Sequence, residues 1–166
     1  MREKALYIIV GIIFTVFFWS CIKKIHYSSV PHIEYEDFIR YGKNIDSVEL
    51  VISFTDEEGD IGLDKADTQG IFKNGNLWMI YYYDSNGTWA AHDTSRTSPQ
   101  FDTLKIGFRV PPLLPPGDPD EPMKGLIYVK QNPFINFSKK IMYEIYLYDK
   151  AMHKSEKIKT PAIYLN

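Results

Sequence analysis

The sequence predicts an all-β domain, a β-sandwich of about seven antiparallel strands. Two observations carry this prediction. Short segments rich in Tyr, Ile, Val and Phe recur every ten to twenty residues or so, and residues that form turns (Gly, Asn, Asp and Pro) separate them. In addition, no segment after residue 33 shows the period of 3.6 that marks an amphipathic helix.

The N-terminal segment has the layout of a bacterial lipoprotein signal peptide. Arg2 and Lys4 supply a short positive region, and residues 5–19 carry no charge and are almost wholly apolar. Ser20 directly precedes Cys21, the only cysteine, so we expect cleavage before Cys21 and acylation of its thiol. The alternative is an uncleaved membrane helix, because this apolar run of about 17 residues is close to the roughly 20 that span a bilayer.

Cleavage at that point divides the chain into a signal peptide (residues 1–20), a lipidated tether (21–32) and one β-sandwich domain (33–166). With Cys21 committed to the anchor, the domain has no thiol for a disulfide and must be stabilised by its core. The mature chain keeps 17 basic and 20 acidic side chains, a net charge of −3, which gives no reason to expect nucleic-acid binding.

The clearest strand covers residues 46–54. Val48, Leu50, Ile52 and Phe54 alternate there with mostly polar residues, so the four apolar side chains share one face and should point into the core. The other expected strands cover residues 33–39, 77–83, 104–110, 126–130, 141–149 and 158–165.

Two connections have clear turn chemistry. Asn86-Gly87 suits the positive φ angles of a tight type I′ turn, so we expect a hairpin that joins residues 81–83 to Thr88 and Trp89. Residues 111–122 are rich in proline, which donates no ladder hydrogen bond, and should form a stiff exposed loop. Seven short strands with such turns favour an immunoglobulin-like arrangement.

An acidic segment, residues 55–64, starts where the strand 46–54 ends. Its Asp56, Glu58 and Asp60 offer oxygen ligands at alternate positions, with glycines nearby to bend the chain, as a Ca²⁺ site requires. In an immunoglobulin-like sandwich the loops after the second and sixth strands lie at one end, so Asp149 is expected to join them. The spacing does not match an EF-hand loop, and the alternative is that these residues simply form turns.

Aromatic residues make up 15% of the chain and gather in the expected strands. Alternation directs half of each set outward, and Trp78, Tyr82 and Trp89 are our candidates for an exposed platform that stacks on sugar rings or binds a partner protein. The alternative is packing within the sheet, since aromatic residues are favoured in strands and stabilise them through cross-strand pairs.

The sequence contains no recognised catalytic motif. It has no G-x-S-x-G elbow, no P-loop and no H-E-x-x-H. Its four histidines, His26, His32, His92 and His153, do not have the spacing of a zinc site. We therefore expect a protein that is not an enzyme, with a hydrolase that uses two distant carboxylates as the alternative.

Several segments together resemble uncharacterised lipoproteins of Bacteroidota with an immunoglobulin-like domain. They are residues 46–56, Gly-Asp-Ile-Gly-Leu at 59–63, Pro-Pro-Leu-Leu-Pro at 111–115 and Tyr-Glu-Ile-Tyr-Leu-Tyr-Asp at 143–149. The segment after 149 is similar to the closing strand pair of bacterial immunoglobulin-like domains, with Met152 and His153 in place of Gly and Asn. The resemblance implies a fold and a place in the cell envelope, and no catalytic residue. Lipoproteins displayed outside the cell in that phylum carry acidic residues after the acylated Cys, so the basic 23–24 pair favours an outer-membrane position facing the periplasm.

The sequence thus predicts a lipid-anchored, non-catalytic protein of the cell envelope that binds a protein or glycan partner through its β-sandwich. Two alternatives remain: a hydrolase that acts on envelope polysaccharide, and a structural spacer stabilised by Ca²⁺. Ca²⁺ is the only cofactor that the sequence indicates.

Overall fold

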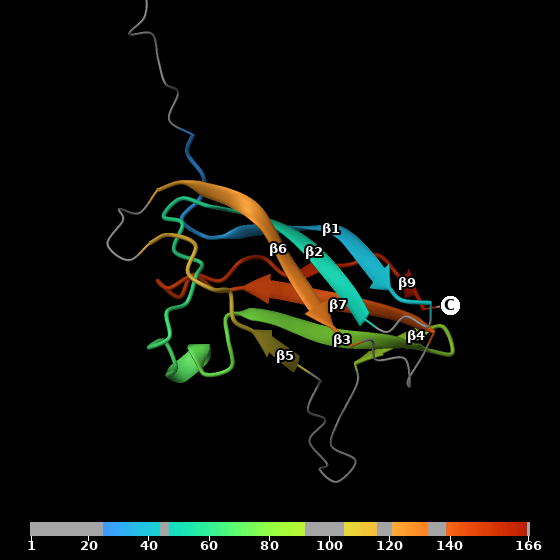
Figure 1. The fold of residues 1–166 in the computed structure, drawn as a ribbon. Helices are drawn as coiled ribbons and strands as arrows, with labels where there is room; N and C mark the ends of the chain where they lie inside the picture. Colours follow the sequence, from blue (N-terminus) through green and yellow to red (C-terminus); the bar gives the residue numbers. More distant parts are fainter. Residues whose placement is uncertain (1–24, 44–46, 92–104, 116–120, 133–138, 166) are drawn as a thin grey trace, which may run out of the picture.

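The computed structural model describes residues 25–43, 47–91, 105–115, 121–132 and 139–165. Within them two antiparallel sheets pack face to face, which confirms the predicted all-β sandwich (Figure 1). The elements in chain order are β1 (His32–Tyr41), β2 (Ser47–Asp56), the 3₁₀ helix η1 (Gly70–Phe72), β3 (Leu77–Ser85), β4 (Thr88–Ala91), β5 (Lys105–Phe108), β6 (Met123–Gln131), β7 (Lys140–Leu147), β8 (Ile158–Lys159) and β9 (Ile163–Tyr164). The predicted signal peptide and Cys21 lie outside the described residues, and within these residues no helix is long and apolar enough to cross a membrane.

The first sheet has the order β1-β2-β6, with β2 at its centre. Both neighbours run antiparallel to β2. Val48, Leu50, Ile52 and Phe54 are all buried in the core, as their alternation predicted. A strand with one buried face can take only one register, because a slip of one residue would turn these four side chains to solvent.

The second sheet is built around β3 and β7. β5 pairs with the first half of β3 and β4 with its second half, so these two strands lie end to end along one edge. β8 and β9 share the far edge of β7 in the same way. Where this sheet faces the first one, Tyr81 and Tyr143 meet edge to face with ring centroids 5.8 Å apart. Both rings belong to the core.

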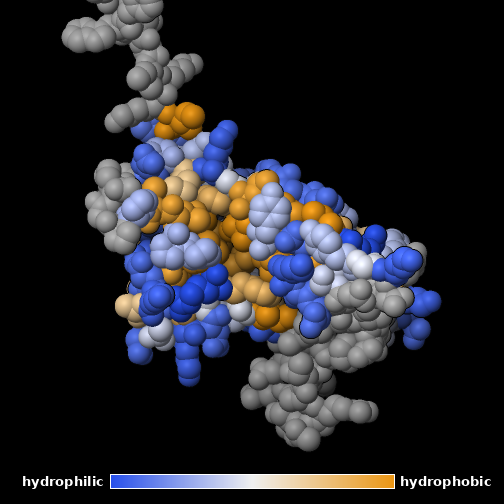
Figure 2. Space-filling view, viewed as in Figure 1, coloured by the Kyte–Doolittle hydropathy of each residue, from blue (hydrophilic) through white to orange (hydrophobic). Residues whose placement is uncertain are grey.

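One end of the core is closed by the loop between β2 and β3. Ile61 and Leu63 of this loop are buried, and Ile61 belongs to the core cluster together with Val110, which follows β5. The Leu63 N–H donates to the Val110 carbonyl at 2.9 Å. Seen from the side of β3 and β6, apolar side chains gather along the seam between the sheets and polar ones surround them (Figure 2).

The predicted hairpin is confirmed. Asn86 and Gly87 have φ angles of 55° and 85°, and they join Ser85 of β3 directly to Thr88 of β4. The Gly87 N–H donates to the Asp84 carboxylate at 2.6 Å. Two residues with positive φ are what a type I′ turn requires.

The prediction of one closing strand over residues 158–165 was wrong, because two short strands, β8 and β9, occupy it. Thr160 lies between them. Its side-chain oxygen accepts from the Tyr143 N–H at 3.1 Å, in place of a backbone carbonyl. Pro161 follows and has no N–H to donate, so the ladder is interrupted here. The strand expected over 141–149 also ends earlier, at Leu147.

Residues 25–31 form no strand but contact the sandwich at the end where β2 and β7 finish (Figure 1). The Glu57 N–H donates to the Ser28 carbonyl at 3.2 Å. The Glu57 carboxylate in turn accepts from the Tyr27 N–H and lies 2.9 Å from Nδ1 of His26. The polypeptide therefore enters the domain at the same end as the acidic loops described below.

Candidate functional site

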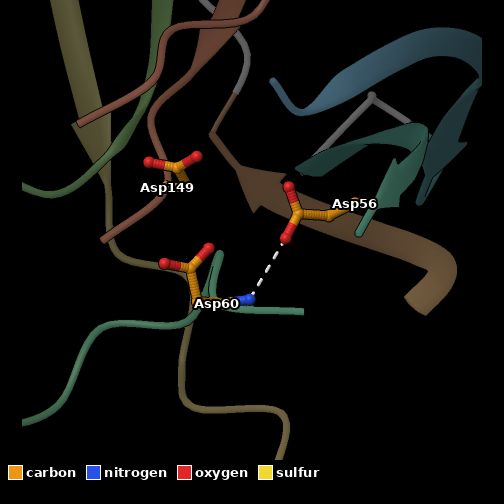
Figure 3. A group of neighbouring side chains, drawn as sticks. All are labelled: Asp56, Asp60 and Asp149. Atoms are coloured by element: carbon orange, nitrogen blue, oxygen red, sulfur yellow. Dashed lines mark hydrogen bonds between the residues drawn. The ribbon is translucent and has the colours of Figure 1, made fainter. Parts of the chain in front are cut away.

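Two loops far apart in the sequence bring four acidic residues to one end of the sandwich. Asp56 is the last residue of β2, Glu58 and Asp60 follow it, and Asp149 lies just beyond β7. One carboxylate oxygen from each of Asp56, Asp60 and Asp149 lies within 4.8 Å of the other two (Figure 3). We call Asp56, Glu58, Asp60 and Asp149 the acidic cluster. It contains the four residues singled out from the sequence.

Two members of the acidic cluster are fully buried, since Asp56 and Asp149 both have 0% of their surface exposed. Oδ2 of Asp56 accepts from the Asp60 N–H at 3.1 Å. Its Oδ1, and Oε2 of Glu58, are buried without a hydrogen-bond partner among the described residues. Burial is the main reason why the pKa of Asp56 is raised from 3.8 to about 6, and the charges of Asp60, Asp149 and Glu58 add to it.

Asp149 also has a structural role in its own loop. Its carboxylate accepts from the His153 N–H at 2.7 Å and lies 2.8 Å from Nδ1 of the same histidine. Met152, between them, has a φ of 69°. The hydrogen bond that the His153 ring makes to the Asp149 carboxylate raises the pKa of His153. Asp149 therefore both stabilises its own turn and belongs to the acidic cluster.

Backbone hydrogen bonds keep the two loops in contact. The Lys150 N–H donates to the Asp60 carbonyl at 3.1 Å. Behind them, the buried Asn76 donates from Nδ2 to the carbonyls of Ile61 (2.7 Å) and Tyr148 (2.8 Å). The carboxylates are thus close together because the backbones that carry them are joined.

The candidate aromatic residues share a different surface, the outer face of the second sheet. Trp78 and Tyr82 alternate on β3 with residues whose side chains enter the core. Trp89 is the β4 partner of Asp84, which follows Tyr82 by two positions, and cross-strand partners point to the same side of a sheet. Trp89 is 36% exposed, whereas Trp78 and Tyr82 are half-buried. The alternation thus predicted the correct face.

Lysine side chains lie over these rings. Nζ of Lys105 is 4.2 Å from the ring centroid of Trp78. Tyr146, the partner of Trp78 on β7, has Nζ of Lys154 at 4.3 Å from its ring. Such contacts are cation–π interactions. We call this surface the basic aromatic face and define it by Trp78, Tyr82, Trp89, Tyr146, Lys105, Lys140, Lys154, Lys157 and Lys159.

The charge of this face is positive. Glu144 pairs with Lys157 at 2.7 Å and with Lys159 at 3.8 Å, and Asp84 pairs with Lys140 at 3.0 Å. Five lysines therefore stand against two carboxylates among the residues described there, a surplus of three positive charges. Such a surface attracts negatively charged ligands.

A pocket of about 270 Å³ opens at the Trp78 end of the basic aromatic face. The ring of Trp78 lies close to Gly107, where a Cβ atom would come within 3.2 Å of the indole. The pocket thus combines two aromatic rings, two ammonium groups and an amide. Its lining residues are Gly70, Ile71, Lys73, Asn74, Trp78, Lys105 and Tyr148.

Two larger hollows lie elsewhere. One of about 490 Å³ lies over the first sheet beside His32 and Leu126, and one of about 620 Å³ lies between Leu63 and Pro112. Their exposed walls are mainly apolar. The pocket beside Trp78 offers the denser set of directional polar groups, which is the feature that fixes a ligand's orientation.

Sequence reasoning missed the lysines of the basic aromatic face. A signal for three of them existed, because Lys154, Lys157 and Lys159 occur within six residues. Lys105 gave none, since it reaches Trp78 only through the pairing of β5 with β3.

In comparisons with known proteins, no family model, curated protein or solved structure matches the chain. The resemblance to Bacteroidota lipoproteins stays a prediction.

Proposed function

We propose that this chain is a lipid-anchored, non-catalytic protein of the cell envelope whose β-sandwich binds an acidic glycan on the basic aromatic face. The observation that carries the proposal is the pocket beside Trp78, where Trp78 and Tyr148 stand next to Lys73 and Lys105. Aromatic rings offer flat surfaces for sugar rings, and ammonium groups pair with carboxylates or phosphates.

A glycan suits this surface better than a protein does. A stable protein interface needs roughly 800 Å² on each side with an apolar centre. Here ammonium groups lie over the rings of Trp78, Tyr146 and Trp89, so the centre of the face is charged. A concave pocket of about 270 Å³ next to further lysines matches a chain of small charged units.

Burial of the carboxylates favours binding over hydrolysis. A glycosidase needs two carboxyl groups that reach the substrate from both sides of the scissile bond. Asp56 and Asp149 come close to Asp60, but both are fully buried. A polysaccharide cannot reach them in this conformation.

An immunoglobulin-like fold is part of the proposal and is supported by strand order. The sheets β1-β2-β6 and β4-β3-β7-β8 follow the order of strands A-B-E and C′-C-F-G in such domains. The loops after strands B and F lie at one end in that arrangement, and here they carry the acidic cluster.

The anchor and the position in the outer membrane, facing the periplasm, rest on the signal layout and Cys21. Labelling with an alkyne fatty acid should mark the wild type and leave Cys21→Ala unmarked. A full-length, unlabelled protein in membranes would instead mean that residues 5–21 span the bilayer.

Glycan binding is tested by affinity electrophoresis of the full-length protein in detergent, with polygalacturonate as the acidic polymer and dextran as the neutral one. We expect retardation by polygalacturonate that weakens with salt, and a loss of about tenfold or more in affinity for Trp78→Ala. Tyr128→Ala is the matched control, since Tyr128 is 57% exposed on β6, in the other sheet.

Equal retardation by dextran, no retardation by either polymer, or the same loss for both variants would overturn the proposal. Capture of an acidic protein in place of the polymer would mean that the basic aromatic face binds a protein partner and not a glycan.

A further inference from the structure

The acidic cluster is a feature separate from the basic aromatic face, and its charges are poorly balanced. The ammonium of Lys150 is 2.8 Å from Asp64, outside the cluster. His153 is held by Asp149. Among the described residues no basic side chain pairs with Asp56 or Glu58. Four carboxylates thus lie together, with the imidazole of His153 against Asp149 and the charge of the Lys150 ammonium acting on Asp60.

Two buried oxygens point to a missing partner. Oδ1 of Asp56 and Oε2 of Glu58 are enclosed by the protein, and within the described part of the chain nothing donates a hydrogen bond to them. The carboxylate of Asp56 is directed toward those of Asp60 and Asp149 (Figure 3). A buried carboxylate is costly unless it is paired or coordinates a metal, so this arrangement calls for a cation.

The spacing of the oxygens fits one ion. Ca²⁺ binds six to eight oxygens at about 2.3–2.6 Å, so two ligands on one ion are at most about 4.6–5.2 Å apart. The oxygens from Asp56, Asp60 and Asp149 lie within 4.8 Å of one another. A set made only of carboxylate oxygens suits a hard cation and disfavours zinc or copper.

We propose that the acidic cluster is a Ca²⁺ site, with Asp56, Asp60 and Asp149 as ligands and Glu58 closing the shell. The ion fastens the β2–β3 loop to the β7–β8 loop. The inference does not depend on glycan binding, since it rests on different residues at the end of the sandwich. It adds a cation to the contact already made by the Lys150 N–H and the Asp60 carbonyl.

The first test is calorimetric titration of Ca²⁺ into the full-length protein, stripped with EDTA and held in detergent. We expect one ion per chain. Ca²⁺ at a hundred times its Kd should raise the Tm by about 5–10 °C over the value in EDTA. Mg²⁺ should raise it less, because it demands a tighter octahedral shell and gives up water reluctantly.

The second test is Asp56→Asn, which keeps an acceptor for the Asp60 N–H and removes one charge. In EDTA this variant should be at least as stable as the wild type, because a like charge is gone from the cluster. In Ca²⁺ the order should reverse, since the wild type gains and the variant gains little. The control is Glu36→Gln, an exposed carboxylate of β1, which should keep the full gain.

No heat of Ca²⁺ binding, the same wild-type Tm in Ca²⁺ and EDTA, or an equal gain for Asp56→Asn would each overturn the proposal. These results leave the polygalacturonate experiment untouched, so the two proposals fail separately.

Discussion

Asn76, the residue before β3, makes more tertiary hydrogen bonds than its position in a turn suggests. It is fully buried. Its Nδ2 donates to the Ile61 and Tyr148 carbonyls, and its Oδ1 accepts from the Val110 N–H at 3.1 Å. One amide therefore joins three segments, two of which lead into the acidic cluster and one into the pocket beside Trp78.

Replacing this amide should be severe. Asn76→Ala removes three hydrogen bonds and leaves three backbone groups without this partner, two of them in buried bonds and that of Tyr148 part-buried. At about 1–1.5 kcal/mol for each bond, we expect the free energy of unfolding to fall by about 3–4.5 kcal/mol. At about 2–4 °C per kcal/mol for a domain of this size, the Tm should fall by about 6–18 °C.

Urea unfolding followed by tryptophan fluorescence, together with a thermal melt, measures this loss. Asn132→Ala is the control, because Asn132 is exposed, and it should change the stability by less than about 0.5 kcal/mol. Asn76→Asp keeps the size of the side chain but points an oxygen at two carbonyls. At neutral pH it should therefore lower the free energy of unfolding at least as much as Asn76→Ala does. A loss below about 1 kcal/mol for Asn76→Ala would refute the claim that this amide holds the loops together.

Three further predictions concern backbone geometry, pH and the N-terminal segment. Gly75 has a φ of 105°, and a Cβ there would lie 2.3 Å from the Phe108 carbonyl oxygen. Gly75→Ala should therefore lower the free energy of unfolding, measured by urea titration, by more than about 3 kcal/mol. Gly70→Ala, in open space at a φ of 58°, should lower it by about 1 kcal/mol. In EDTA, the free energy of unfolding should fall as the pH rises from 3.8 through about 6, because Asp56 keeps its proton to higher pH in the folded than in the unfolded chain. Asp56→Asn should remove this part of the pH dependence. A pH dependence that stays the same in Asp56→Asn would contradict the burial argument. Glu57→Ala removes the acceptor of the Tyr27 N–H, so hydrogen exchange at that amide should speed up by about tenfold or more, while an unchanged rate would mean that the contact is not formed in solution.

Local patterns in the sequence were enough to predict most of the strands and the turns between them. The alternation of Val48, Leu50, Ile52 and Phe54 predicted both β2 and the face that enters the core, because a strand repeats every two residues. Asn86-Gly87 predicted the β3–β4 hairpin, because few other residue pairs accept two positive φ angles. Both signals act within a few residues and need no partner from elsewhere in the chain.

The candidate sites were partly predictable. The acidic composition of residues 56–60 and the sandwich expectation together placed Asp149 beside Asp56, and the structure brings them together. The sequence could not show that Asp56 is buried with one oxygen unpaired, because burial depends on how the loops close over the end of the core.

Residue type and short-range period were sufficient to predict an all-β chain, its inward faces, the hairpin and the signal-like N-terminus. Three other features became visible only in the folded chain: Thr160 splits the closing strand, Lys105 lies over Trp78, and Asn76 joins three loops. These features depend on the register between strands and loops that are far apart in the sequence. Register is set by packing and hydrogen bonding of the whole sandwich, and no local pattern carries it.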